Sequence, residues 1–174
     1  MIPHGYSIER AGSDDLLHLP RIEREAGVLF AGLGIADSVL SDETSLEELQ
    51  YAQERGLLWV ARAQNNEVVG FALLEVIDDQ LHLEEIDVHP AHGRRGIGRA
   101  LIEAVCAWGS SAGYHYVTLT TFRNIAWNEA FYAHAGFRSL SASELTPALA
   151  DIVRDEASRG LDPARRVVMR RDLS

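Results

Sequence analysis

The chain has 174 residues, of which 47% are hydrophobic and 24% are charged, so it can form one globular domain with a sizeable core. Its formal net charge of −10 opposes binding to nucleic acid and to anionic membranes. The single cysteine, Cys106, excludes a disulfide framework or a cysteine zinc site within one chain. No apolar run approaches the roughly 18 residues of a membrane span. Because a signal-peptide pattern is also absent, we expect one cytoplasmic domain over residues 1–174.

The N-terminal part is predicted to contain one strand and two helices. A helical pattern over 13–27 has Ser13 as its expected N-cap, acidic residues in its first turn and Gly27 near its end. Pro20 inside this pattern predicts a kink or a break. We expect a strand over 6–10, loop-like structure over 28–42 and a second helix over 41–56.

The rest of the chain alternates between strand and helix patterns. Two apolar runs at 57–63 and 67–77, separated by the polar "QNN", predict a β-hairpin. We expect further strands over 80–88, 115–122, 137–140 and 165–173, and helices over 96–112, 126–136 and much of 142–160. This order predicts an α/β fold (a mixed, α+β-type sheet) of about seven strands with helices on both faces.

The most informative segment is "LHLEEIDVHPAHGRRGIGRALIEAV", residues 81–105. A strand runs into a basic glycine turn, and the turn runs into an amphipathic helix. Such a turn presents backbone N–H groups and a helix N-terminus to a phosphate. Gly96 and Gly98 suit a close approach of the backbone to a ligand, and charge-assisted hydrogen bonds from nearby arginines would add to it. The alternative is a glycine-rich helix entry with solvated arginines.

Two nucleotide-binding motifs are excluded at this turn. A Rossmann fingerprint needs a third glycine where this chain has Leu101. A Walker P-loop needs a lysine, and the chain contains none.

With its flanks, the segment resembles the GNAT family of acetyl-CoA-dependent N-acetyltransferases. Residues 84–105 are similar to that family's fourth strand, pyrophosphate loop and following helix. "NEAFYAHAGF", 128–137, is similar to its second signature, a short helix with a tyrosine before a Gly-Phe strand entry. The two signatures have the family's order and spacing, and the resemblance covers nearly the whole chain. One departure is that the loop begins with Gly93 where the family usually has Gln or Arg, and arginine follows at Arg94.

The resemblance implies the GNAT-like acyl-CoA N-acyltransferase fold, with acetyl-CoA as co-substrate and no metal. The pantetheine arm would pair with strand backbone at Ile86, Asp87 and Val88, and a backbone N–H near Ile86 or Asp87 would bind the thioester oxygen. Asn124 and Asn128 lie near the family's pantetheine-binding asparagine, although the usual spacing falls on Ala126. The pyrophosphate would be bound by Arg94, Arg95, Gly96, Ile97, Gly98, Arg99 and Ala100.

Three carboxylates are candidates for the general base that accepts the amine proton: Glu84, Glu85 and Asp87. Strand alternation puts Glu84 on the face of Ile86 and Val88, which are expected to be core, and Glu85 and Asp87 on the other face. Two neighbouring carboxylates can raise a pKa, so we expect Glu85 to be the base, acting through water. A bulge would break the alternation, so Glu84 stays open, as does the alternative that all three are solvated.

Tyr132 matches the tyrosine that the family uses to protonate the coenzyme A thiolate. A phenol suits this role because its ordinary pKa lies above that of a thiol. The alternative is an aromatic side chain packed beside Phe131. His82, His89 and His92 lack the spacing of a metal site, and we expect them to be surface or loop residues.

Two functions remain open from the sequence. The first is an N-acetyltransferase that moves acetyl from acetyl-CoA to a primary amine by direct attack in a ternary complex. The acceptor would be a small molecule or a protein N-terminus. The second is a catalytically weak acyl-CoA-binding sensor or interaction module. Neither involves nucleic acid or a membrane, and the resemblance allows a homodimer.

Overall fold

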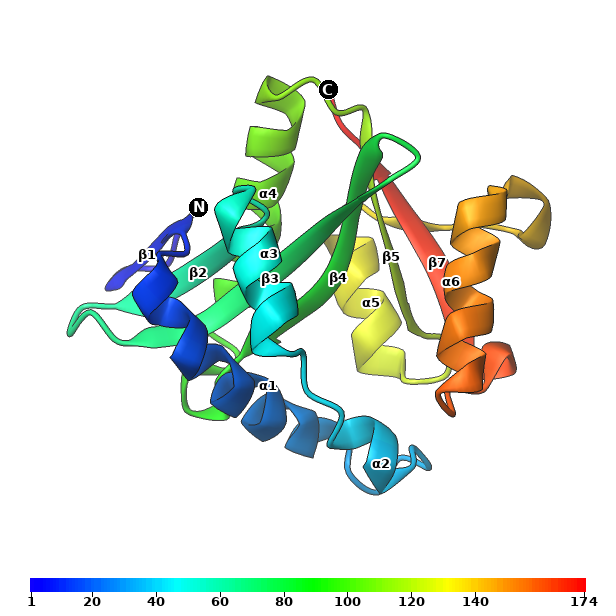
Figure 1. Cartoon of the computed structure of the whole chain (residues 1–174), viewed down its shortest axis with the longest axis horizontal. Helices are drawn as coiled ribbons and strands as arrows, with labels where there is room; N and C mark the ends of the chain where they lie inside the picture. Colours follow the sequence, from blue (N-terminus) through cyan, green and yellow to red (C-terminus); the bar gives the residue numbers. More distant parts are fainter. The chain divides into compact units, whose positions relative to one another are not determined.

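The computed structural model describes all of residues 1–174. Its strands form one seven-stranded sheet in the order β1-β2-β3-β4-β5-β7-β6 (Figure 1). The β4–β5 pairing is parallel, whereas β1–β2, β2–β3, β5–β7 and β6–β7 are antiparallel, so the sheet is mixed as predicted. The strands are β1 (Tyr6–Arg10), β2 (Leu58–Ala63), β3 (Val68–Ile77), β4 (Gln80–Val88), β5 (Tyr116–Phe122), β6 (Arg138–Ser139) and β7 (Arg166–Asp172).

Six α-helices and several short 3₁₀ segments connect the strands. The α-helices are α1 (Leu19–Gly27), α2 (Asp37–Leu40), α3 (Leu46–Glu54), α4 (Ile97–Ser111), α5 (Ala126–His134) and α6 (Pro147–Ser158). The 3₁₀ helices are Ser13–His18, Val28–Phe30, Pro90–His92, Ala142–Glu144 and Pro163–Arg165. No helix has the length and apolarity needed to cross a bilayer.

The chain divides into two compact units. The first comprises Met1–Glu75 and Glu84–Val105, and the second comprises Val76–Leu83 and Cys106–Ser174. In the first unit, α3 contacts β2 (Figure 1). The core of the first unit is apolar, because one stripe of each helix and the β2–β3 hairpin bury their side chains in it. The fully buried ones include Leu19, Ile22, Leu49, Leu58 and Phe71.

The helix starts in the first unit differ from the predicted ones. Ser13 is not an N-cap, because Gly12 caps the 3₁₀ helix and donates its N–H to Asp15 Oδ2 over 2.8 Å. The predicted break at Pro20 is confirmed, since the 3₁₀ helix ends at His18 and Pro20 lies in the first turn of α1. Helix α3 starts later than predicted, because the hydroxyl of Ser45 accepts the Glu48 N–H at 3.2 Å and caps it there.

The second unit is built around β5 and β7, which pair from Tyr116↔Asp172 to Phe122↔Arg166. Residues Leu81–Leu83 of β4 pair in parallel with Val117–Leu119 of β5. Helix α6 contributes Leu149 to an apolar cluster with Leu140 and Val168 of β7. A group of hydrogen-bonded polar side chains lies between α6, β5 and β7 in this unit.

Candidate active site

The carboxyl end of β4 carries the three candidate bases in different environments. Glu84 is exposed, whereas Glu85 and Asp87 are partly buried. The carboxyl groups of Glu85 and Asp87 are within hydrogen-bonding reach of each other. The structure therefore brings together the two candidates that strand alternation placed on one face.

Burial and mutual proximity raise the proton affinity of this pair. Desolvation, followed by the charge of Asp87 and the hydrogen bond to it, raises the pKa of Glu85 well above its ordinary value. Desolvation raises the pKa of Asp87 to about 7, although the hydrogen bond from Glu85 opposes the rise. The arrangement is that of an acid pair in which a proton on Glu85 is shared with an Asp87 carboxylate.

A third carboxyl group, that of Glu23 on α1, belongs to the same cluster. Its charge raises the pKa values of both Glu85 and Asp87. Glu23 accepts hydrogen bonds from the Thr44 N–H, at 3.0 Å to Oε2, and from the Thr44 hydroxyl, at 3.1 Å to Oε1. Burial raises the pKa of Glu23 in spite of these bonds. The cluster Glu23–Glu85–Asp87 is called the carboxyl cluster below.

One oxygen of this cluster has no donor in the protein. Asp87 Oδ2 is fully buried, and no N–H or O–H group donates a hydrogen bond to it. A buried oxygen without a hydrogen-bond donor costs free energy. Asp87 Oδ2 can be satisfied by a proton on Glu85 or by a donor that a ligand brings.

The backbone of β3 approaches β4 closely beside this pair. A Cβ atom at Gly70 would lie 2.9 Å from the carbonyl oxygen of Asp87 and 3.3 Å from a methyl carbon of Val88. Glycine at position 70 therefore permits the observed path of β4 at Asp87.

After β4 the chain forms the glycine turn that the sequence predicted. The short 3₁₀ helix Pro90–His92 leads into Arg94, at φ +59°, and Gly96, at φ +84°, and α4 begins at Ile97. Left-handed residues alternating with others direct successive N–H groups toward one side and form an anion-binding concavity. The first N–H groups of α4 also lack acceptors within the helix and add the positive end of its dipole.

The predicted loop residues contribute in different ways. Ile97 and Ala100 have buried side chains, and Ala100 already donates its N–H to the Gly96 carbonyl over 3.0 Å. Gly98 is not left-handed but is the second residue of α4. Arg94 and Arg99 are exposed and make no ion pair, so their guanidinium groups are available to an anion.

Arg95 differs from these two arginines because its side chain is held by the protein. Its Nη1 donates to the Tyr6 hydroxyl over 3.0 Å, and that hydroxyl lies 2.9 Å from His92 Nδ1. His89, at the end of β4, accepts the Ala91 N–H at Nδ1 and contacts Glu25 of α1 through Nε2. The loop is thereby connected to both β1 and α1.

The second signature lies in the second unit on α5. Tyr132 is partly buried, and its ring contacts Phe131 and Phe137 edge to face, with centroid separations of 5.1 and 6.0 Å. Asn128 is buried and its side-chain amide bonds the Thr121 hydroxyl, whereas Asn124 is exposed before the helix. The two candidate asparagines are therefore not equivalent, and only Asn124 presents an accessible amide.

Two polar groups were not foreseen from the sequence. Glu23 was not among the candidates, because its bonds to Thr44 join α1 to a segment about twenty residues further along the chain. His82 was expected to be a surface or loop residue, but it is buried in β4, and its Nδ1 lies 2.8 Å from the Thr118 hydroxyl. Burial lowers the pKa of His82 to about 4, so the ring is neutral.

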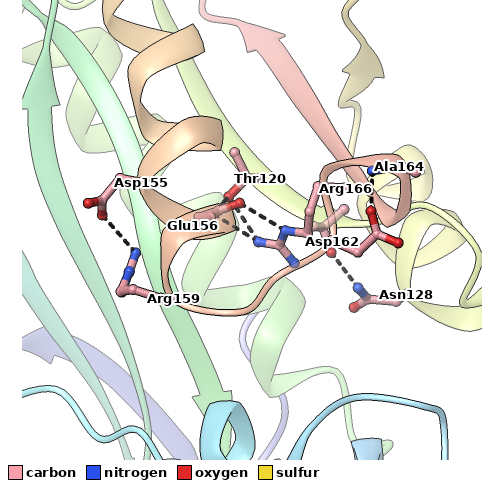
Figure 2. Close-up of polar contacts among 9 residues, drawn as sticks. Thr120, Asn128, Asp155, Glu156, Arg159, Asp162, Ala164 and Arg166 are labelled. Atoms are coloured by element: carbon pink, nitrogen blue, oxygen red, sulfur yellow. Dashed lines mark hydrogen bonds and ion pairs between the residues drawn. The ribbon is translucent and has the colours of Figure 1, made fainter.

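Near His82, α6 is anchored by a buried ion pair. Glu156 and Arg166 bond through both carboxylate oxygens at 3.0 Å, and both contact the Thr120 hydroxyl (Figure 2). The side chains of the ion pair are only 7% and 10% exposed. No group of three or more His, Cys, Asp or Glu side chains that could hold a metal ion is present.

Comparison with known proteins gives the family of this chain. The model of the Acetyltransferase (GNAT) family matches residues 31–137, which is more than half of the chain. The chain therefore belongs to the GNAT acetyltransferase family, a family of acyltransferases.

Solved structures share the fold at low sequence identity. One is the PaiA N-acetyltransferase of Thermoplasma acidophilum in complex with coenzyme A, with a TM-score of 0.74, 19% identity and coverage of 96% of this chain and 98% of that one. Another is the ribosomal-protein-S18-alanine N-acetyltransferase of Escherichia coli, with a TM-score of 0.67, 22% identity and coverage of 97% of this chain and 94% of that one. A third is the N-acetylglutamate synthase of Neisseria gonorrhoeae, complexed with coenzyme A and N-acetyl-glutamate. The TM-score is 0.71 at 20% identity, and the match covers 97% of this chain but only 35% of that one.

Proposed function

We propose that this protein is an acetyl-CoA-dependent N-acetyltransferase. It would transfer acetyl to a primary amine by direct attack within a ternary complex, with residues 1–174 acting as one catalytic domain. The observation that carries the proposal is the Glu85–Asp87 pair, which lies directly before the glycine turn and has raised proton affinity. A protein that only bound acyl-CoA would need no such pair.

Binding of acetyl-CoA would rest on the turn after β4. The N–H groups of the Arg94–Gly96 turn and the first turn of α4 would receive the pyrophosphate, and no side chain at Gly96 obstructs the approach. Arg94 and Arg99 would add charge-assisted hydrogen bonds. Because the backbone supplies most donors, glycine in place of the family's Gln or Arg at position 93 is compatible with binding.

Amine deprotonation would be the task of the carboxyl pair. An ammonium acceptor must lose a proton before its nitrogen lone pair can attack the thioester carbon. A base is most effective when its pKa lies near the working pH, and burial raises the pKa of Asp87 in this pair to about 7. The Glu85–Asp87 pair, which holds one proton when singly ionised, would accept the amine proton directly or through one water molecule and would then hold two.

Collapse of the adduct would complete the transfer. Attack forms the C–N bond, and the former amine nitrogen then releases its second proton to solvent. When the adduct collapses, the C–S bond breaks and the leaving thiolate takes a proton to become free coenzyme A. A backbone N–H near Ile86 or Asp87 would stabilise the developing oxyanion. Following the family resemblance, Tyr132 would donate the proton to the thiolate.

The test is the release of free thiol from acetyl-CoA with a broad panel of primary amines, measured across pH. Glu85→Gln should lower kcat/KM most at neutral and mildly alkaline pH, where the wild-type pair has lost a proton but the acceptor is still mostly an ammonium ion. Asp87→Asn and Glu84→Gln distinguish the three carboxylates. An unchanged pH–rate profile in Glu85→Gln removes Glu85 from the mechanism.

The same assay addresses the alternative function. Amine-dependent release identifies a transferase. Slow release that no amine accelerates, together with tight coenzyme A binding, would instead support an acyl-CoA sensor.

A further inference from the structure

The N-terminal segment of the chain contacts the Arg94–Gly96 turn, which is called the phosphate turn below. The Tyr6 N–H donates to the Pro3 carbonyl over 3.2 Å, and Gly5 is left-handed at φ +86°, so Pro3–Tyr6 forms a tight turn. The Cγ atom of Pro3 lies 3.7 Å from the position that a Cβ atom at Gly96 would take. Tyr6 is also the first residue of β1, so pairing with β2 fixes its backbone beside the phosphate turn.

The hydroxyl of Tyr6 links two side chains of the loop. Arg95 Nη1 donates to it over 3.0 Å, and it lies 2.9 Å from Nδ1 of His92. Because a guanidinium can only donate, the Tyr6 oxygen accepts from Arg95 and its own proton is available to His92. This pattern assigns Nδ1 of His92 as an acceptor and places its ring proton on Nε2.

His92 is itself held by the protein, so it is a fixed anchor for Tyr6. Its N–H donates to the His89 carbonyl over 2.8 Å, and its ring meets the rings of Tyr6 and His89 edge to face, at 5.8 and 6.2 Å between centroids. His89 in turn contacts Glu25 of α1. Through Tyr6, the guanidinium of Arg95 is therefore attached to a point that β1, β4 and α1 hold in common.

This attachment distinguishes Arg95 from the other two arginines of the loop. The exposed side chains of Arg94 and Arg99 have no such hydrogen bond. A phosphate that binds a free arginine must restrict its rotamers, and that loss of freedom opposes binding. The side chain of Arg95 is restricted before any ligand arrives, and the N–H donors that Tyr6 does not use remain available to a phosphate.

We propose that Tyr6 is a positioning residue for coenzyme A binding, because its hydroxyl holds the Arg95 guanidinium against His92 in the orientation that receives the pyrophosphate. This inference rests on the proposed binding of acetyl-CoA at the phosphate turn. It deepens that proposal by assigning the principal phosphate contact among the arginine side chains to Arg95. Tyr6 acts through Arg95 and need not touch the ligand.

The first experiment is calorimetric titration of coenzyme A into the wild type and Tyr6→Phe. Phenylalanine keeps the edge contact with His92 and removes only the hydroxyl, so Kd should rise about threefold to tenfold. The matched control is Tyr51→Phe on α3. Its exposed ring also contacts an arginine, with the Arg55 guanidinium carbon 3.4 Å from the ring centroid, and its Kd should equal that of the wild type. Thermal unfolding checks that each variant is folded.

A double-variant cycle separates positioning from a general effect on structure. Arg95→Met should raise Kd about tenfold, and adding Tyr6→Phe to it should change Kd by less than about twofold. In Arg94→Met and Arg99→Met, the Tyr6→Phe change should keep its full effect. In steady-state kinetics, Tyr6→Phe should raise KM for acetyl-CoA and leave kcat and KM for the amine within about twofold.

The outcomes distinguish this proposal from the proposed function. Unchanged affinity in folded Tyr6→Phe, or losses that add in Tyr6→Phe/Arg95→Met, overturns the role of Tyr6 and leaves coenzyme A binding intact. If the wild type does not bind coenzyme A, the proposed function fails, and titration with inorganic pyrophosphate then tests Tyr6 alone. Pyrophosphate binding that Tyr6→Phe weakens supports the positioning role, and absence of pyrophosphate binding overturns it as well.

Discussion

The carboxyl of Glu85 hydrogen-bonds with the Asp87 carboxyl two residues further along β4, and both are affected by the charge of Glu23 on α1. This arrangement stores a proton inside the first unit of the fold. It also destabilises the folded chain at pH values where both groups ionise, which makes the pair detectable without a substrate.

Asp87→Asn should stabilise the protein more at pH 8 than at pH 5. The folded-state pKa of Asp87 is about 7, against an ordinary value of 3.8, so the native chain binds more protons than the unfolded chain between these values. Stability contributed by this group is therefore lost as pH rises through that window. After allowance for solvent screening, we expect a gain of about 1–2 kcal/mol at pH 8, or about 2–8 °C in Tm. Thermal melts at both pH values test this, and equal shifts at the two would contradict it.

Tyr132→Phe should slow turnover while leaving acetyl-CoA affinity nearly unchanged. Phenylalanine keeps the ring contacts with Phe131 and Phe137 and removes only the acidic hydroxyl. General acid catalysis contributes on the order of a hundredfold or more, so kcat should fall by about that factor. Steady-state kinetics and calorimetry together measure both quantities. Turnover within about twofold of wild type would assign the proton donor to another group or to water.

Gly96→Ala should weaken coenzyme A binding, whereas Gly113→Ala should not. Both glycines are left-handed, at φ +84° and φ +91°, so an added Cβ strains the two backbones by similar amounts, roughly 1–2 kcal/mol. A Cβ at Gly96 would come no closer than 3.7 Å to Pro3, and one at Gly113 would meet nothing within 4 Å. Only Gly96 lies in the proposed phosphate turn. Calorimetric titration with coenzyme A should show a Kd increase of about tenfold for Gly96→Ala alone. The same increase in Kd for Gly113→Ala would show that backbone strain, and not a change in the phosphate turn, weakens coenzyme A binding.

Arg166→Met should destabilise the protein strongly because it leaves Glu156 buried without its partner. Removal of one member of a buried ion pair costs about 3–5 kcal/mol. The exposed pair of Arg159, the C-cap of α6, with Asp155 on α6, at 3.3 Å, is the matched control (Figure 2). Arg159→Met should change the free energy of unfolding by less than about 1 kcal/mol. Urea denaturation compares the two, and the double variant Arg166→Met/Glu156→Gln should recover much of the loss.

The segment around the glycine turn was the most predictable part of the fold. Strand β4 has the predicted bounds, and α4 begins one residue after its predicted start, at Ile97. Alternating apolar residues, Pro90 and the glycines indicate the same boundaries there. The mixed seven-stranded sheet followed from the order of such segments.

Contacts between segments distant in sequence were not predictable from local patterns. Glu156 lies on α6, and its burial depends on its ion pair with Arg166, ten residues later on β7. The place of Glu23 in the carboxyl cluster depends on how α1 packs, which helix propensity does not specify. Serine is a common N-cap residue, but the helix that Ser13 begins is capped by Gly12, whose N–H donates to the Asp15 side chain.

The close approach of β3 to Asp87 has a consequence for mutational screens. At Gly70 the smallest possible side chain would collide with the carbonyl oxygen of Asp87 at 2.9 Å, so even alanine forces the two strands apart or shifts the carboxyl cluster. A loss of activity at position 70 would thus resemble the loss of a reacting group, although glycine offers no chemistry. The absence of a Cβ atom at Gly70 therefore helps to set the geometry of the acid pair. Inactivating substitutions in this protein will include residues that never touch a substrate.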